Sequence, residues 1–253
     1  HSHYSNILLT DSVATNEDYA KRAIELGQTV LSSCEHGTPG NYRQCYDLAK
    51  KYGLRWRNVA EVYFVKDRLA EDEGGFRDRK NCHMILAAKT EKGMYDLNEV
   101  ISEANISGYY YRPRVDMELL LRLDPKDVFV TTACIAGVWA YGYSSDKEAN
   151  TFQYDWTEPD KLIRQLHTHF GDSFMLEVQY HNTDKQKAVN RHILDLYRSE
   201  GIPIIAGMDS HYIYPEDKAL RDMRLEANHL VYEDEAGWYL DFPSEEEAFR
   251  RFE

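Results

Sequence analysis

The sequence predicts an α/β fold, in which β-strands and α-helices alternate along the chain and the strands run parallel. Short apolar runs of the kind that form buried strands are separated by longer amphipathic segments with helical periodicity. Helix start and stop residues flank these segments, for example the capping-box pattern at Thr15 and Asp18 and the glycines Gly27 and Gly53. This alternation is typical of parallel strands joined by right-handed helical crossovers.

The apolar runs and the capping signals together predict the individual elements. A first strand is expected at residues 1–5, with its start before the sequence given. Six more are expected at residues 28–33, 59–65, 84–88, 128–133, 174–178 and 202–206, which makes seven. The helices are expected after Thr15 and at residues 42–52, 97–106, 159–170, 183–199 and 218–229.

Three stretches interrupt this alternation. Residues 68–80 are charged and contain glycine, which predicts a surface loop, and residues 141–156 are polar and aromatic, which predicts an irregular segment. Residues 232–253 form an acidic tail with a helix start at Ser244. We expect residues 1–231 to form one barrel and the tail to begin a following region of a longer chain. The absence of an initial Met before His1 favours the same interpretation.

The composition limits the classes of partner. The chain has 253 residues, 43% of them apolar and 29% charged, and a formal net charge of −13. This length suits one large α/β barrel or two small domains. The negative charge argues against a free-standing nucleic-acid binder, because neutralising phosphates requires a basic face. No apolar stretch reaches the roughly 18 residues of a membrane span, so no membrane partner is expected.

The cysteines indicate the redox environment. Cys34, Cys45, Cys82 and Cys134 form no Cys-x-x-Cys pair, which excludes a zinc ribbon or a thioredoxin-type motif. They are also too few for a dense disulfide framework. A reducing cytoplasm is therefore the expected location.

Residue types that bind metal ions accompany almost every predicted strand. In a parallel α/β barrel the carboxyl ends of the strands converge on the active site, so one ligand from each of several strands can build a metal cluster. His1 and His3 lie in the first predicted strand, and Asp11 follows it. The later members are His36 after the second strand, Glu61 within the third, His83 at the start of the fourth, Cys134 at the end of the fifth, and Asp209 and His211 after the last.

Strand geometry supports a shared site. Positions i and i+2 of a strand point to the same face, so His1 and His3 can reach one ion. Asp209 and His211 can do the same if the last strand continues through them. Imidazole suits zinc and iron, carboxylate suits manganese, and a thiolate favours zinc. A bridging Glu61 would allow two ions about 3.5–4 Å apart, which is the spacing of two-metal phosphoesterases.

Several motifs, taken in order, resemble the PHP (polymerase and histidinol phosphatase) family. Within this family, the motifs most resemble the PHP domain of bacterial or phage DNA polymerase III alpha subunits, and the resemblance covers nearly the whole chain. It implies the family's fold, a distorted barrel of seven β/α units. The motifs are His1-Ser-His3, Asp11-Ser12, residues 33–37 (SCEHG), 109–116 (YYYRPRVD), 132–137 (TACIAG), 176–181 (LEVQYH) and 209–212 (DSHY).

The resemblance implies two to three divalent ions, of zinc, manganese or iron, held by nine ligands. One departure is that Glu35 stands where the family has Asp, which we interpret as a change beside the ligands and not as a lost ligand. Carried over by position, the first ion would take His1, His3, Glu61 and Asp209, the second Glu61, His83 and Cys134, and the third Asp11, His36 and His211.

The activity that the resemblance implies is metal-dependent hydrolysis of phosphodiester bonds at DNA 3′ ends, as in a proofreading 3′–5′ exonuclease. A DNA 3′ end would be the substrate, and the polymerase core of the same longer chain would be the partner. Arginine side chains suit phosphate, because the guanidinium offers a two-pronged donor. The candidate catalytic residues are Asp11, Asp209 and His211, and the candidate substrate-binding residues are Arg112, Arg114 and His181.

Two alternative functions remain open. A stand-alone phosphatase acting on a small phosphomonoester would suit the acidic charge, although the motifs at residues 109–116 and 132–137 are of the polymerase type. In the other alternative the metal ions only brace the barrel, which serves as a structural module of a DNA polymerase.

Overall fold

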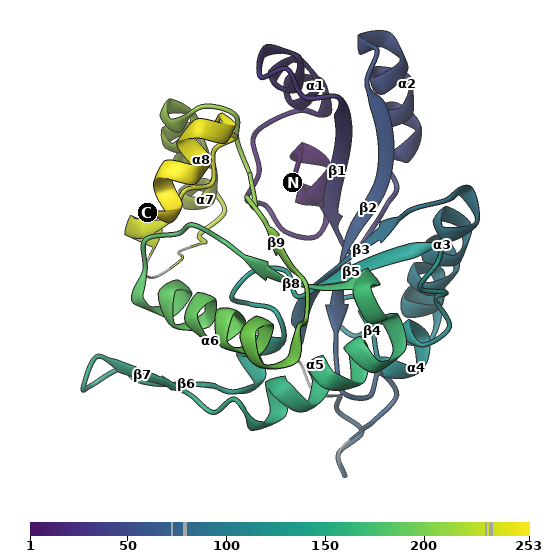
Figure 1. Cartoon of the computed structure of the whole chain (residues 1–253), viewed down its shortest axis with the longest axis vertical. Coiled ribbons are helices and arrows are strands. Elements are labelled where there is room, and N and C mark those ends of the chain that lie inside the picture. The colour runs from purple at the N-terminus through teal and green to yellow at the C-terminus, as the bar shows by residue number, and fades with distance from the viewer. Residues whose placement is uncertain (72, 78–79, 231, 233–234) are drawn as a thin grey trace. The chain divides into compact units, whose positions relative to one another are not determined.

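The structure of the chain is a computed structural model that describes residues 1–71, 73–77, 80–230, 232 and 235–253. It divides into two compact units. The first comprises residues 1–60, 179–186 and 208–253, and the second comprises residues 61–178 and 187–207. Both units contain helices and strands (Figure 1), so the predicted α/β class is confirmed.

The first unit packs two helices against the start of the sheet. Strand β1 pairs with β2, and α1 and α2 lie side by side against β1 (Figure 1). Small residues such as Ala20, Ala23 and Ala49 allow this close approach, and they pack with Leu31 in the core. The elements of this unit are η1 (His3–Ile7), α1 (Asn16–Glu25), β1 (Val30–His36), α2 (Tyr42–Tyr52), the first part of β2 (Arg55–Phe64), η4 (Pro215–Asp217), α7 (Lys218–Ala227), η5 (Glu235–Gly237) and α8 (Glu245–Phe252).

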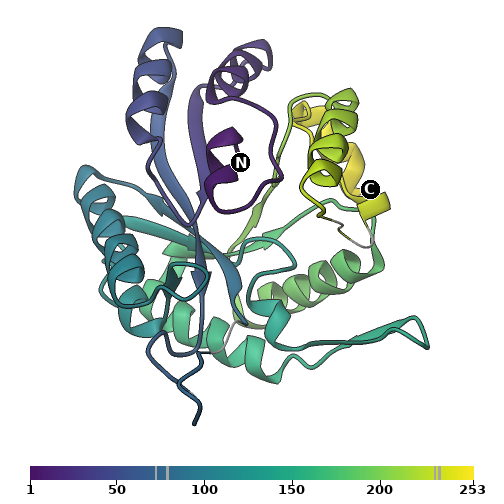
Figure 2. The same ribbon diagram turned by 180° about the vertical axis from the view of Figure 1, so that it is seen from behind.

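The second unit contains most of the sheet, which Figure 2 shows from behind. Its strands follow the order β2-β3-β5-β8-β9, and β4 also pairs with β2. Helix α6 (Asp184–Glu200) begins in the first unit and continues here. The other elements are β3 (Cys82–Ala88), α3 (Glu91–Ile106), β4 (Arg114–Val115), α4 (Met117–Leu120), β5 (Val128–Thr131), η2 (Val138–Tyr141), β6 (Tyr143–Asp146), β7 (Thr151–Tyr154), α5 (Thr157–Phe170), η3 (Gly171–Ser173), β8 (Phe174–Val178) and β9 (Ile204–Ala206).

Most predicted elements are present, with ends shifted by a few residues. Helix α2 covers the predicted residues and ends at Gly53, whose φ of 70° suits a glycine. Helix α1 begins with the predicted capping box, in which Thr15 and Asp18 bond each other's backbone nitrogens. Strand β8 has the predicted bounds, and Ser244 caps α8 as expected.

The prediction of parallel strands is wrong for β3 and β5. Strands β2–β4, β5–β8 and β8–β9 are parallel, whereas β3 and β5 are antiparallel. After α3 the chain forms β4, which pairs with β2, and then helix α4. Strand β5 begins beside the end of β3, so the two strands run in opposite directions. The backbone nitrogen of Lys89, just after β3, donates to the carbonyl of Asp127, just before β5, at 2.7 Å.

The predicted strand at residues 1–5 is also wrong, because this segment curls into the short 3₁₀-helix η1. The hydroxyl of Ser2 accepts from the backbone nitrogen of Tyr4 at 3.1 Å, and the backbone nitrogen of Ser5 donates to the carbonyl of Ser2 at 2.9 Å. The same two serines donate their hydroxyls to the buried Glu35. These local bonds satisfy the backbone without a neighbouring strand.

The predictions for residues 68–80 and 141–156 need correction. Residues 141–156 are not irregular but contain the β6–β7 hairpin, which extends away from α5 (Figure 1). Within 68–80, Arg68 is buried and binds both carboxylate oxygens of Asp116, at 2.8 and 2.9 Å, so this residue is not part of a surface loop. Residues 72, 78 and 79 lie outside the described part of the chain.

The tail at 232–253 contributes to the first unit. Leu240 and Phe242 are buried, and the carbonyl of Leu240 accepts from the backbone nitrogen of His211 at 2.8 Å. The expected boundary at 231/232 falls next to residues 231, 233 and 234, which the structure does not describe. Within the described residues, none of the helices combines the length and apolar character of a membrane span.

Candidate metal centre

Three histidines of the first unit converge on one point. Each of His1, His36 and His211 offers a ring nitrogen, and these atoms all lie within 4.8 Å of one another. The His1 and His36 rings stack at a centroid distance of 4.0 Å, and the His211 ring lies 4.7 Å from that of His1. His36 ends β1, whereas His1 precedes η1 and His211 follows β9 in the chain. Three converging imidazoles form a donor set that suits a transition-metal ion.

Two carboxylates border this histidine cluster. The Oδ2 atom of Asp11 lies 3.4 Å from His211 Nε2, and its Oδ1 lies 3.6 Å from His36 Nε2. The Oδ1 atom of Asp209 lies 3.1 Å from His1 Nε2. Burial would raise the pKa of Asp11, but positive charge on the facing imidazoles of His211 and His36 outweighs it and holds this pKa well below its usual range. Asp11 is therefore an anion at neutral pH.

A backbone carbonyl selects the tautomer of His211. Its Nδ1 lies 2.7 Å from the carbonyl oxygen of Asp209, and because a carbonyl only accepts, Nδ1 carries the proton. In the neutral ring Nε2 is then unprotonated and faces the carboxylate of Asp11 at 3.4 Å. Two acceptor atoms this close require a proton or a cation between them. The arrangement fits a divalent metal ion bound by imidazole and carboxylate.

The loop that carries Asp209 and His211 is held in a strained conformation. Asp209 has a φ of 50°, in the left-handed region that few non-glycine residues adopt. The hydroxyl of Ser12 lies within hydrogen-bond distance of the carbonyls of His1, at 2.8 Å, and His211, at 2.9 Å. The backbone nitrogen of Val13 also donates to the carbonyl of His211 at 3.1 Å. These bonds fix the candidate ligands from three chain segments relative to one another.

The second unit has a smaller cluster made by Glu61, His83 and Cys134. The Nδ1 atom of His83 lies 3.1 Å from Glu61 Oε1 and 3.7 Å from Cys134 Sγ. Glu61 lies on β2, His83 on β3, and Cys134 just after β5. The turn at Cys134 is tight, since Ala133 has a φ of 53°. A carboxylate, an imidazole and a thiol at these distances suit a zinc ion.

The structure brings two of the three predicted ligand sets together. Asp11, His36 and His211, the set expected for the third ion, lie close together in the first unit, and the set expected for the second ion is the cluster of the second unit. The first set is divided between the units, with His1 and Asp209 in one and Glu61 in the other. His3 is exposed on η1, so the argument that placed it on one strand face with His1 fails. Its role as a ligand stays a prediction.

The two arginines expected to bind phosphate differ in their surroundings. The guanidinium carbon of Arg112 lies 5.6 Å from the ring centre of Tyr63, whose ring meets that of His83 edge to face at 5.6 Å. Arg114 is 1% exposed, and its guanidinium donates to the carbonyls of Gly108, at 2.9 Å, and Arg68, at 2.6 Å. The burial of Arg114 is better explained by a structural role than by the phosphate binding that we expected.

His181 is a buried imidazole of the first unit. Its Nδ1 accepts from the backbone nitrogen of Tyr239 at 3.2 Å, and its ring stacks on that of Trp238 at 4.6 Å. In the neutral ring Nε2 therefore carries the proton, and among the described residues this atom has no hydrogen-bond partner. Burial is the largest cause that lowers the pKa of His181, to about 4, so the ring is neutral at pH 7. A buried donor of this kind suits the oxygen of a ligand or a water molecule.

Sequence reasoning missed the network around Glu35. This residue was expected only to lie beside the ligands, but its carboxylate accepts from Ser2, Ser5, Ser33 and Asn41. The clustering of small hydroxyl residues next to His1 and His36 was the available signal. It could not identify the partners, because they come from three separate chain segments.

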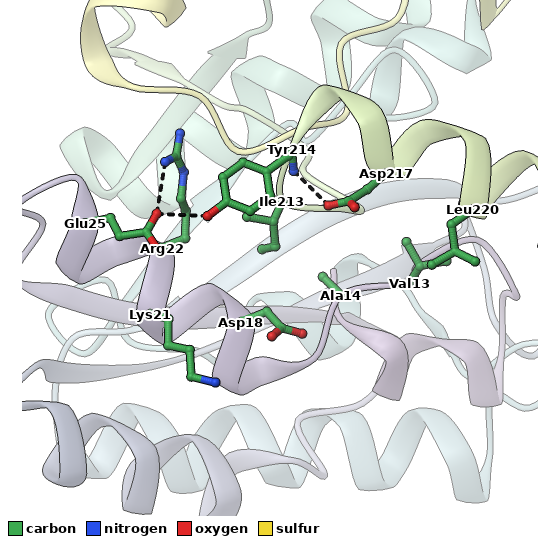
Figure 3. Close-up of a pocket in the computed structure, with 10 residues that line it drawn as sticks. All are labelled: Val13, Ala14, Asp18, Lys21, Arg22, Glu25, Ile213, Tyr214, Asp217 and Leu220. Carbon is green, nitrogen blue, oxygen red and sulfur yellow. Dashed lines mark hydrogen bonds and ion pairs between the residues drawn. The ribbon is translucent and has the colours of Figure 1, made fainter.

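A pocket of about 360 Å³ in the first unit contains none of the candidate ligands. Figure 3 shows it between α1 and the segment around η4. Two of its charged lining residues, Arg22 and Glu25, are bonded to each other at 3.1 Å, and Glu25 also accepts from the Tyr214 hydroxyl at 3.0 Å. We therefore place the candidate metal sites at the two clusters of candidate ligands and not in this pocket.

The family model for the PHP domain matches residues 1–181, and the chain therefore belongs to the PHP domain family. Among curated proteins, the chain is similar to DNA polymerase III alpha subunits. The chain is 29% identical over 265 residues to the DNA polymerase III subunit alpha of Aquifex aeolicus, covering 99% of this chain and 22% of the relative. It is 30% identical to that of Borreliella burgdorferi, covering 88% of this chain and 18% of the relative. The chain thus spans about a fifth of the length of these relatives.

Solved structures with a similar backbone have low sequence identity. One, from Bifidobacterium adolescentis, is described as a candidate metal-dependent phosphoesterase, with a TM-score of 0.44 and 12% identity over 79% of this chain and 84% of that one. Another is an amidohydrolase from Chromobacterium violaceum, with a TM-score of 0.44 and 11% identity over 85% of this chain and 93% of that one.

Proposed function

We propose that this chain is a metal-dependent phosphoesterase domain that hydrolyses phosphodiester bonds at DNA 3′ ends. The observation that supports this most directly is the convergence of three imidazoles and two carboxylates in the first unit. Buried histidines that face carboxylate oxygens with an unprotonated nitrogen are costly unless a cation binds there. Membership of the PHP family supports the same reaction class.

The donor atoms favour zinc or manganese as the bound ion. His1, His36, His211, Asp11 and Asp209 would hold an ion in the first unit, and the cluster with Cys134 would hold a second, for which the thiolate favours zinc. Two to three ions fit these donors. When bound, such ions polarise a phosphoryl group and lower the pKa of a coordinated water.

The remaining candidate residues have roles that follow from their protonation and position. Asp11 is a fixed anion, and we assign it the orientation of the attacking water. The Nε2–H of His181 would donate to a phosphate oxygen, since this atom is buried with no partner among the described residues. In the second unit, Arg112 would bind a phosphate of the substrate from its position over Tyr63.

A DNA end, and not a long duplex, suits the charge of the chain. A net charge of −13 repels a polyanion, but a single 3′ terminus presents few phosphates and would be bound by the metal ions. The curated relatives are DNA polymerase III alpha subunits, so we propose that the partner is a polymerase core that delivers the 3′ end.

The test is the shortening of a single-stranded oligonucleotide labelled at its 5′ end, with Mn²⁺ or Zn²⁺ added. We expect a ladder of products shortened from the 3′ end and no cleavage of a strand whose last linkages are phosphorothioate. Asp209→Asn should lower the rate by more than about 100-fold, because losing a ligand costs more than losing a residue that supports one. Asparagine tolerates the left-handed backbone at this position, so the change adds no strain.

The matched control is Asp195→Asn, which removes a carboxylate that is 74% exposed. It should leave the rate unchanged. Equal activity in wild type and Asp209→Asn would show that a contaminating nuclease is responsible. Internal cuts, or cleavage of the blocked strand, would contradict the 3′-end specificity.

The acidic charge also favours a second candidate, a phosphatase acting on a small phosphomonoester. A chromogenic aryl phosphate assayed beside the oligonucleotide separates the two functions. Full metal binding without hydrolysis of either substrate would instead favour a structural module of a polymerase.

A further inference from the structure

The carboxylate of Glu35 is the centre of a buried hydrogen-bond network in the first unit. Its Oε1 accepts from the hydroxyls of Ser2, at 2.5 Å, and Ser33, and from the side-chain amide of Asn41 at 2.7 Å. Its Oε2 accepts from the backbone nitrogen of Ser2 at 3.1 Å and from the hydroxyl of Ser5 at 2.5 Å. Five donors around a side chain that is 0% exposed stabilise an ionised carboxylate, which has no proton to give.

This network determines the direction of each hydrogen bond at Ser5. A hydroxyl has one proton, and Ser5 must donate it to Glu35, because the carboxylate can only accept. The oxygen of Ser5 can then only accept from its other neighbours. One of these is the backbone nitrogen of His36, at 3.1 Å, and the other is Nδ1 of His1, at 3.4 Å. The Nδ1 atom of His1 therefore carries a proton.

We propose that Glu35, acting through the hydroxyl of Ser5, is a positioning residue that holds His1 in the tautomer with Nε2 available to bind a metal ion. Nε2 is the atom that faces Asp209 Oδ1 at 3.1 Å. His211 reaches the same state by a different route, because a backbone carbonyl receives its Nδ1–H. Both histidines thus have the tautomer that exposes Nε2 before an ion binds, His1 through the Glu35 network and His211 through the carbonyl of Asp209, which lowers the cost of binding.

The inference rests on the proposed metal site and concerns how that site is prepared. It gives Ser5 and Ser33 different roles, although both donate a hydroxyl to the same carboxylate. Ser33 binds Oε1 and accepts from Asn41 at 2.8 Å. Only Ser5 also lies against His1. Ser5→Ala and Ser33→Ala are therefore a matched pair, since each removes one hydroxyl bond to Glu35 and only the first removes the partner of His1.

The first measurement is the affinity of the purified chain for Zn²⁺, by competition with a chromogenic chelator. Ser5→Ala should weaken binding about 10- to 100-fold, the usual effect of removing the partner of a ligating histidine. Ser33→Ala should weaken it by less than about threefold. Equal losses in the two variants would overturn the proposal, because they would assign the effect to the stability of the Glu35 network alone.

The second measurement is nuclear magnetic resonance of the Zn²⁺-loaded chain with ¹⁵N-labelled histidine. His1 should show a proton on Nδ1 and a metal-bound Nε2. In Glu35→Gln the amide can donate to Ser5, so that the hydroxyl can turn toward His1, and the Nδ1–H signal should weaken or disappear. Binding of His1 through Nδ1 in the wild type, or an unchanged spectrum in Glu35→Gln, would overturn the proposal.

These readouts separate the inference from the proposed function. If the chain binds Zn²⁺ with His1 in the expected tautomer but cleaves no DNA, the positioning role stands and the proposed activity fails. If the chain cleaves DNA while His1 binds through Nδ1, the activity stands and the positioning role fails. A chain that binds neither Zn²⁺ nor Mn²⁺ contradicts both.

Discussion

The ring of His181 combines burial with a fixed neutral tautomer, and this gives it a measurable effect on stability. Its pKa is about 4 in the folded chain, against an ordinary value of 6.5, mainly because burial disfavours the charged ring. The unfolded chain therefore binds a proton more readily between these values. The stability that the neutral ring provides is present above pH 6.5 and is lost as the pH falls toward 4.

We predict that lowering the pH from 7.5 to 5.0 costs the wild type about 2 kcal/mol more than it costs His181→Phe. Phenylalanine keeps a ring against Trp238 but does not titrate. The free energy of unfolding of both proteins is measured by urea denaturation at the two pH values. An equal pH dependence in the two proteins would show that His181 is not buried in its neutral form.

Gly137 is another residue whose replacement has a predictable cost. A Cβ at this position would lie 1.9 Å from the carbonyl oxygen of Thr132, and the backbone nitrogen of Gly137 donates to the carbonyl of Cys134 at 2.8 Å. Gly137→Ala should therefore displace the turn and lower the free energy of unfolding by about 1–3 kcal/mol. Urea denaturation measures this loss, and a variant as stable as the wild type would contradict the close approach.

The type of a residue predicts the chemistry of its side chain better than it predicts where that side chain lies in the fold. The resemblance to the PHP family implied that Asp11, His36 and His211 form one set, and their side chains lie close together in the first unit. The strand argument failed for His3, because hydrogen bonds from Ser2 and Ser5 to Glu35 curl that segment into η1. These partners are distant in sequence, and no local pattern in the chain reveals them.

At the scale of elements, local sequence signals predicted which helices and strands are present but not which strands pair or in which direction. Helix α2 ends at the predicted glycine because a left-handed residue is a local requirement. The antiparallel pairing of β3 with β5 depends on where β4 and α4 direct the chain, which is not a local property. The β6–β7 hairpin did have a local signal, since the aromatic residues Phe152, Tyr154 and Trp156 alternate with polar residues in the sequence.

The capping box of α1 provides a test at this scale. The hydroxyl of Thr15 accepts from the backbone nitrogen of Asp18 at 3.2 Å, and the Asp18 carboxylate accepts from the backbone nitrogen of Thr15 at 2.9 Å. Thr15→Ala should lower the free energy of unfolding by about 1 kcal/mol, whereas Thr15→Ser keeps the hydroxyl and should lose much less. Thermal or urea denaturation of both variants measures the difference. Equal losses would show that the methyl group, and not the cap, stabilises the helix.

At the scale of the whole molecule, the negative charge has a different meaning once the ligand clusters are considered. A net charge of −13 argues against a protein that binds duplex DNA by itself. Part of this charge, however, lies in carboxylates such as Asp11, Asp209 and Glu61, at the candidate sites. Two or three divalent ions bound at these carboxylates would neutralise about a third to a half of the net charge.

Removing divalent ions with a chelator tests on the intact chain whether such ions bind at these sites. Ions that bind only the folded state stabilise it by about 2.7 kcal/mol when present at 100 times their dissociation constant. For a chain of this size, excess EDTA should therefore lower the melting temperature of the Zn²⁺-loaded protein by about 5–10 °C. EDTA saturated beforehand with Zn²⁺ should have no effect, and Asp209→Asn should show a smaller decrease because one ligand is missing. An identical melting curve with and without EDTA would mean that the converging histidines and carboxylates are not held together by ions.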